Sequence, residues 1–173
     1  PEKGSVLDPF AGVGTIPFEA ALRGNVSYGF EISPAAYIIA NAKVQKQSIE
    51  KCEKIILNLE SFIKANKCTQ AEKENTKIFG YNGKLVDYYE SRTLNEILLA
   101  RKFFKINNPK TPEEFFVMAC LLHVLHGNRP YALSRRSHPL TPYKPTGDYE
   151  YRSLIIKVRE KIQRTVNDKL PSQ

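Results

Sequence analysis

The sequence has 173 residues, of which 42% are hydrophobic and 25% are charged, the composition of one ordinary globular domain. It has no apolar run long enough to span a bilayer, no signal-peptide pattern and no CxxC pair among its three cysteines, so we expect a cytoplasmic protein without a membrane partner or a disulfide framework. The net charge of +8 favours an anionic partner, nucleic acid first, although a solvated lysine-rich surface explains the charge equally well.

The start of the chain predicts a strand, a glycine turn, a helix and a second strand. Residues 5–7 have the character of a short buried strand that places Asp8 at its carboxyl end. Thr15 is a suitable N-cap for the helix that follows the turn. Apolar residues then alternate with small ones over residues 26–30, which predicts a second strand ending at Glu31.

A further helix completes a βαβα unit over residues 1–66. Ser33 and Pro34 have the cap and first-turn chemistry of a helix start, and helical spacing continues to about residue 66, with room for a break. A βαβ unit followed by a helix predicts the α/β class, with a parallel sheet flanked by helices.

The pattern of residues 67–127 predicts an insertion that is followed by helices. The polar stretch 68–77 has the composition of an exposed loop, and residues 85–89 predict a strand. Thr93 and Thr111 each stand three residues before a glutamate, the pattern of a capping box that opens a helix.

Residues 128–173 combine a loop rich in Pro, Arg and Tyr with an amphipathic C-terminal helix. Cations interleaved with aromatic residues in this loop offer phosphate contacts and stacking faces for a nucleic acid. The alternative is a loop whose arginines pair with carboxylates of the same chain. The candidate nucleic-acid-binding residues are Arg129, Arg135, Arg136, His138 and Lys144.

The glycine turn at residues 8–15, DPFAGVGT, predicts a nucleoside-type ligand. A P-loop fails because no Lys follows the glycines, and a dinucleotide site fails because Pro17 stands where a third glycine belongs. S-adenosylmethionine has no pyrophosphate to cradle. A carboxylate before the turn suits its α-ammonium group, and Glu31 at the next strand end suits its ribose hydroxyls.

The same residues resemble the cofactor motif of DNA amino-methyltransferases, usually DPF-x-G-x-G-T, and the likeness extends through IPFEAALRG and GFEISPAA. This family modifies N6 of adenine or N4 of cytosine. The resemblance implies a partial Rossmann-like methyltransferase domain over residues 1–173 that binds S-adenosylmethionine and acts on DNA in a restriction–modification setting. It implies that the turn holds the methionine end of the cofactor, that Glu31 holds the ribose and that Ile32 packs against the adenine. The cofactor residues are then Asp8, Pro9, Phe10, Ala11, Gly12, Val13, Gly14, Thr15, Glu31 and Ile32.

The family's catalytic motif, (Asp/Asn/Ser)-Pro-Pro-aromatic, is missing, because the sequence contains no Pro-Pro pair. We therefore expect this chain to carry the cofactor-binding part of the enzyme and no catalytic residue. The remainder is expected after Gln173, before Pro1 in a permuted order, or on a second polypeptide.

Two other functions remain open. GTIPFEAAL also resembles RNA methyltransferases that act on guanine N2 of tRNA or rRNA, and a noncatalytic cofactor-binding subunit or sensor would need no catalytic motif. A metal site is not expected: Cys120, His123 and His126 share a helix face, but nothing nearby supplies a fourth ligand.

Overall fold

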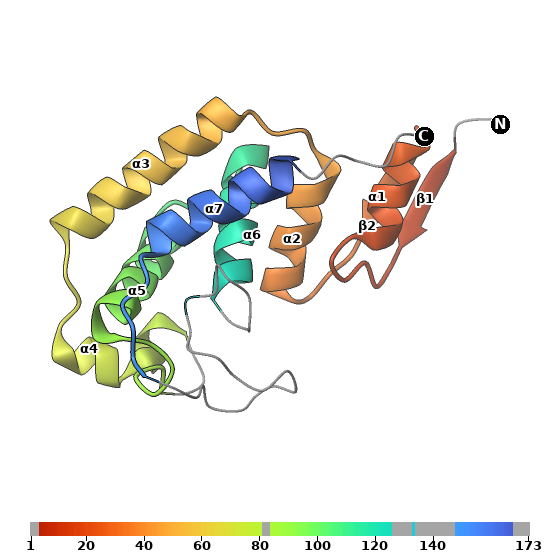
Figure 1. The fold of residues 1–173 in the computed structure, drawn as a ribbon. Coiled ribbons are helices and arrows are strands. Elements are labelled where there is room, and N and C mark those ends of the chain that lie inside the picture. The colour runs from red at the N-terminus through yellow and green to blue at the C-terminus, as the bar shows by residue number, and fades with distance from the viewer. Residues whose placement is uncertain (1–3, 81–83, 126–132, 134–147, 168–173) are drawn as a thin grey trace. The chain divides into compact units, whose positions relative to one another are not determined.

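The structure is a computed structural model that describes residues 4–80, 84–125, 133 and 148–167 (Figure 1). The chain divides into two compact units, each treated separately below. Unit 1 comprises Pro1–Ile55 and Pro109–Ala119, and unit 2 comprises Ile56–Asn108 and Cys120–Gln173. No helix within the described ranges is both long enough and apolar enough to cross a membrane.

Unit 1 opens with a parallel βαβ arrangement. Strands β1 (Ser5–Asp8) and β2 (Val26–Gly29) form a two-stranded parallel sheet, and helix α1 (Thr15–Leu22) connects them (Figure 1). Asp8 pairs with Gly29, so the carboxyl ends of both strands lie side by side at one edge. The parallel pairing and the flanking helix are those that the sequence predicts, and they are compatible with part of a Rossmann-like fold.

Two element boundaries differ from the expected ones. The expected strand end at Glu31 is wrong, because β2 ends at Gly29; the N–H of Phe30 still donates to the Asp8 carbonyl at 3.0 Å, but the chain then leaves the sheet. The expected N-cap Thr15 is also wrong. Gly14 takes that position with a φ of 78°, in the left-handed region, and Thr15 is the first helical residue.

One face of the sheet carries apolar side chains that no described residue covers. Leu7, Val26 and Tyr28 lie on this face in register and are 63%, 55% and 60% exposed. The other face belongs to α1, whose Pro17 carbonyl accepts a 3.1 Å hydrogen bond from the Ser27 hydroxyl. The alternation of apolar and small residues along β2 thus predicts correctly which side chains share a face. The apolar face, however, is exposed and not buried. Parallel sheets are normally covered on both faces.

Helix α2 (Pro34–Val44) follows the sheet, and helix α3 (Ile49–Ala65) follows after a short break. The Ser33 hydroxyl accepts the N–H of Ala36 at 3.4 Å, and Pro34 occupies the first turn, where its missing N–H costs nothing. The expected helix start and the expected break are both confirmed.

Helix α6 (Pro112–Val124) begins in unit 1. Its capping box forms as expected: the Thr111 hydroxyl accepts the N–H of Glu114 at 3.3 Å, and the Glu114 carboxylate accepts the N–H of Thr111 at 2.9 Å. The ring of Phe115 then makes an edge-to-face contact with Tyr37 of α2, with the ring centroids 5.8 Å apart. These contacts attach α6 to α2 within unit 1.

The buried Glu113 side chain links α6 to the start of α3, and this predicts a pH dependence of stability. Its carboxylate accepts the backbone N–H of Ser48 at 3.1 Å, and this hydrogen bond holds the pKa of Glu113 below its usual value of 4.5. A lowered folded-state pKa stabilises the protein above the unfolded-state value, and this contribution is lost as the pH falls through the folded-state value. We expect Glu113→Gln to lower the free energy of unfolding at neutral pH and to flatten its decline on acidification.

Urea denaturation of Glu113→Gln and wild type at neutral pH and at about pH 3.5 measures this dependence. Glu19→Gln, at an exposed position on α1, serves as the control. The same decline in wild type and Glu113→Gln would show that the Glu113–Ser48 contact contributes nothing.

The regular secondary structure in the described part of unit 2 is helical. It contains α4 (Gln70–Glu74), the 3-10 helix η1 (Thr76–Phe79), α5 (Ser91–Ile106) and α7 (Leu154–Asn167). Its core consists of apolar side chains that are at most 1% exposed, namely Ile56, Leu59, Leu94, Ile97, Leu98, Leu99, Ala100, Val124, Leu133, Leu154 and Val158. The amphipathic pattern of the C-terminal helix is therefore confirmed.

Two expectations for unit 2 are wrong. The stretch 68–77 contains α4 and the start of η1, because Thr69 and Glu72 form a capping box that the polar composition conceals. The stretch 85–89 is a turn closed by a 3.0 Å hydrogen bond from the Tyr88 N–H to the Leu85 carbonyl, and it has no neighbouring strand among the described residues.

Thr93 does not cap α5 as expected. The carboxylate of Glu90 caps this helix by accepting the N–H groups of Arg92 at 2.7 Å and Thr93 at 3.2 Å. The buried Thr93 hydroxyl instead donates to the Arg152 carbonyl at 3.0 Å and accepts the Arg152 N–H at 2.9 Å. Thr93 therefore connects α5 to the segment that leads into α7.

Candidate functional site

The loop that follows β1 is fixed by its own hydrogen bonds. Asp8 is buried, and its Oδ1 atom accepts the backbone N–H of Phe10 at 3.0 Å, which closes a tight turn after the strand. The N–H of Gly14 donates to the Ala11 carbonyl at 2.8 Å, and the N–H of Ala11 donates to the Phe30 carbonyl at 2.9 Å. The loop after β1 is therefore bonded to the chain that leaves β2.

The two glycines of this loop serve different purposes. Both have positive φ angles, 52° at Gly12 and 78° at Gly14, a region in which other residues are strained. A Cβ atom at Gly14 would lie 2.7 Å from the Cβ atom of Ala40 in α2, so Gly14 is required for packing. A Cβ atom at Gly12 would meet no described atom within 4 Å, so the backbone there faces open space that a ligand can occupy.

Glu31 lies directly after β2, beside this loop. Its Oε1 atom accepts the N–H of Ser33 at 2.6 Å, which leaves its second carboxylate oxygen available for a ligand hydroxyl. Ile32 and Phe10 are 98% and 89% exposed, although both are large and apolar. Together the two loops present carboxylates, open backbone and exposed apolar side chains at one edge of the sheet.

The ten sequence-predicted cofactor residues lie at the last residue of β1, in these two loops and at the first residue of α1. Pro9, Val13 and Thr15 are exposed, whereas Ala11 is buried. A Cβ atom at Gly29 would lie only 2.8 Å from the Cβ atom of Ala11. The absence of a side chain at Gly29 therefore allows the loop after β1 to pack against the end of β2. The sequence pattern marks Gly29 only as a small residue of the second strand and gives no signal for Ala40.

The candidate nucleic-acid-binding residues Arg129, Arg135, Arg136, His138 and Lys144 lie outside the described residues. By sequence they belong to unit 2, which holds nineteen Lys and Arg against ten Asp and Glu, whereas unit 1 holds seven against eight. The excess positive charge of the chain therefore resides in unit 2.

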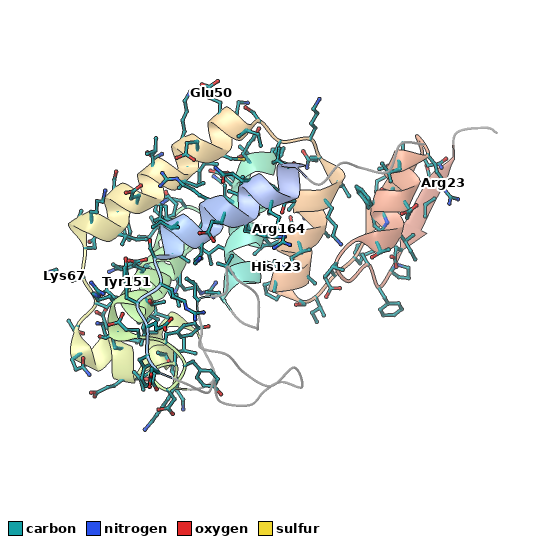
Figure 2. The ribbon with its side chains drawn as sticks, viewed as in Figure 1. Arg23, Glu50, Lys67, His123, Tyr151 and Arg164 are labelled. Carbon is teal, nitrogen blue, oxygen red and sulfur yellow. The ribbon has the colours of Figure 1, made fainter. Side chains whose placement is uncertain are left out.

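Several described cations of unit 2 have protein partners. The Arg159 guanidinium lies 3.2 Å from the Glu60 carboxylate, and that of Arg92 lies 4.0 Å from the ring centroid of Tyr151, labelled in Figure 2. Lys157 pairs with Glu160 on α7 at 2.9 Å. Such partially exposed ion pairs are typical of a solvated helix face, the interpretation that we prefer for α7.

The cysteine and histidine positions of the helices do not form a metal centre within the described ranges. On α6, Cys120 is buried, and His123, which Figure 2 labels, is half-buried. Burial, with the nearby Glu113 carboxylate, raises the pKa of Cys52 to about 11, so this thiol is protonated and unreactive at neutral pH.

Comparison with known proteins gives one informative similarity. A stretch of 54 residues is 41% identical to the Type II methyltransferase M.MjaII of Methanocaldococcus jannaschii. The matched stretch is 31% of this chain and 10% of that protein, so the chain spans only a small part of its relative's length. No family model matches the chain, and no solved structure matches it significantly.

Proposed function

We propose that this chain is the cofactor-binding part of an S-adenosylmethionine-dependent methyltransferase that modifies an exocyclic amine of DNA, either N6 of adenine or N4 of cytosine. The observation that carries the proposal is the pair of hydrogen-bonded loops at the carboxyl edge of a parallel sheet, which include the open backbone at Gly12 and adjoin the carboxylates of Asp8 and Glu31. The partial similarity to a Type II methyltransferase supports the same class of reaction.

The residues of this edge fit the cofactor. The open backbone at Gly12 permits close approach, and the Asp8 carboxylate, which keeps one oxygen beyond its bond to Phe10, provides negative charge for the α-ammonium group. The second oxygen of Glu31 can accept hydrogen bonds from the ribose hydroxyls. Phe10 and Ile32 supply apolar surface for the rest of the ligand. When bound, S-adenosylmethionine supplies an electrophilic methyl group on its sulfonium.

Nucleic acid is the proposed acceptor because unit 2 carries the positive charge of the chain. Its Arg-, Tyr- and Pro-rich segment supplies candidate phosphate contacts, whereas unit 1 is nearly neutral. This difference in charge supports a division in which unit 1 binds the cofactor and unit 2 binds the nucleic acid.

The residues that activate the target amine come, in this proposal, from a further polypeptide segment. The support is the uncovered sheet face in unit 1 together with the nine tenths of the relative that lie outside the matched stretch. A segment that adds strands beside β1 or β2 and covers Leu7, Val26 and Tyr28 would give this parallel sheet the second covered face that such sheets have.

A charge on the uncovered sheet face tests this part of the proposal. When the chain is produced together with the rest of its natural locus, we expect Tyr28→Glu to prevent co-purification of the catalytic segment, because the charge would have to be buried. Ile78→Glu, at a similarly exposed position in unit 2, is the matched control and should leave the association intact. Association that survives Tyr28→Glu would show that this face is not the interface.

Methyl transfer tests the function as a whole. The complete locus product is incubated with S-adenosylmethionine carrying a labelled methyl group, and with duplex DNA, tRNA or rRNA. Label in an amine of duplex DNA is the expected result. Label in guanine N2 of RNA would contradict the DNA assignment and favour an RNA methyltransferase. Cofactor binding without any transfer would favour a noncatalytic subunit or sensor.

A further inference from the structure

Helix α2 touches both halves of the proposed cofactor site. Its N-cap residue is Ser33, whose N–H donates to the Glu31 carboxylate at 2.6 Å. Near its middle, Ala40 lies so close to Gly14 that a Cβ atom added there would be 2.7 Å from the Ala40 Cβ atom and 2.9 Å from its Cα atom. The glycine loop therefore rests directly on the backbone of α2.

Ala40 is the residue of α2 that a Cβ atom added at Gly14 would meet first. Ala40 is seven positions after Ser33, which is about 10 Å along the helix axis. One rigid helix therefore sets the spacing between the loop and Glu31. Helix α2 is anchored in unit 1 by the contact between Tyr37 and Phe115 of α6, and its Ile38 and Ala42 side chains, on the side away from Ala40, are buried. A larger side chain at position 40 would therefore displace the loop more readily than the helix.

Resting on the proposed function, we infer that Ala40 is a positioning residue that holds the Gly12–Gly14 turn at the distance from Glu31 that S-adenosylmethionine requires. Its small side chain sets the place of the turn, and it touches no ligand itself. A larger residue at this position moves the turn, which meets the methionine end of the cofactor. The same substitution does not move Glu31, which binds the ribose in the proposed site.

The test compares two ligands that share the nucleoside. We expect Ala40→Val to reduce affinity for S-adenosylhomocysteine about tenfold while changing affinity for adenosine less than about twofold. Ala40→Gly weakens the helix without pushing on the loop, so its ratio of the two affinities should stay at the wild-type value. Ala35→Val, at an exposed position on the same helix, is the matched control. Calorimetry for the first ligand and ligand-observed NMR for adenosine give the ratio.

The outcomes separate the inference from the function on which it rests. Wild-type protein that binds neither ligand would overturn both. Wild-type binding with an unchanged affinity ratio in Ala40→Val would overturn the inference alone, as would an equal loss for both ligands. Circular dichroism checks folding. If Ala40→Val unfolds unit 1, Ala40→Ser replaces it, because serine adds only one oxygen atom. This variant should lose about threefold in affinity for S-adenosylhomocysteine and keep its affinity for adenosine.

Discussion

Replacing Asp8 with alanine is expected to reduce affinity for S-adenosylmethionine by roughly ten- to a hundredfold, the usual cost of losing a hydrogen bond to a charged group. The side chain has two functions in the proposed site. Its Oδ1 atom closes the turn by accepting the Phe10 N–H at 3.0 Å, and its negative charge faces the α-ammonium group of the cofactor. Alanine removes both functions. Isothermal calorimetry measures the loss.

Two companion variants separate the contributions to this loss. Asp8→Asn keeps an acceptor for the Phe10 N–H but removes the charge, so it should retain the stability of the loop and lose most of the affinity. Glu31→Ala should also weaken binding, because it removes the carboxylate that accepts the ribose hydroxyls in the proposed site. Glu19→Ala, an exposed acid on α1, should have no effect. Unchanged affinity in both Asp8→Ala and Glu31→Ala would contradict the cofactor assignment.

Reversing the charge at Arg135 and Arg136 is expected to weaken binding to duplex DNA at low salt by about two orders of magnitude. Each phosphate contact in B-DNA contributes about 0.9 to the slope of log affinity against log salt, so the loss of two contacts should lower the slope by about 1.8. Fluorescence anisotropy over a salt series gives both the affinity and the slope.

The control for this variant must carry the same change in net charge elsewhere. Lys43→Glu with Lys46→Glu meets this requirement, because both lysines are exposed and belong to unit 1. This control should lower affinity only modestly and keep the wild-type slope. A wild-type slope in the Arg135 and Arg136 variant would show that these arginines serve the structure of their own loop.

The parts of the fold that follow from local chemistry are predictable from sequence. Ser33 with Pro34 and Thr111 with Glu114 start helices as expected, since their partners lie within three residues. Long-range partners are not visible in a sequence. Thr93 matches a capping box but bonds to Arg152, 59 residues away, and Glu90 caps the helix instead.

The sheet shows a second limit of sequence analysis. Alternation along β2 predicts which side chains share a face, but it does not reveal whether anything packs on that face. Tyr28 is 60% exposed because its face meets no described element. The prediction for the stretch 85–89 is wrong for a related reason, since apolar and aromatic residues alone do not distinguish a strand from a partly buried turn.

The candidate site divides in the same way. Asp8, Gly12, Gly14 and Glu31 were predictable because a strand end, a turn and an acidic residue follow each other along the chain. The support for the site was not predictable. Ala40 meets Gly14 from a different helix, and Gly29 meets Ala11 across the sheet edge, so only the three-dimensional structure brings each pair together.

Direct titration of the wild-type protein tests the central claim, that the loops after β1 and β2 form an S-adenosylmethionine site. Calorimetry is performed with S-adenosylmethionine, ATP and NAD under identical conditions. One-to-one binding of S-adenosylmethionine, with no detectable binding of ATP or NAD, is the predicted result. No binding of S-adenosylmethionine, or tighter binding of NAD or ATP, would contradict the account.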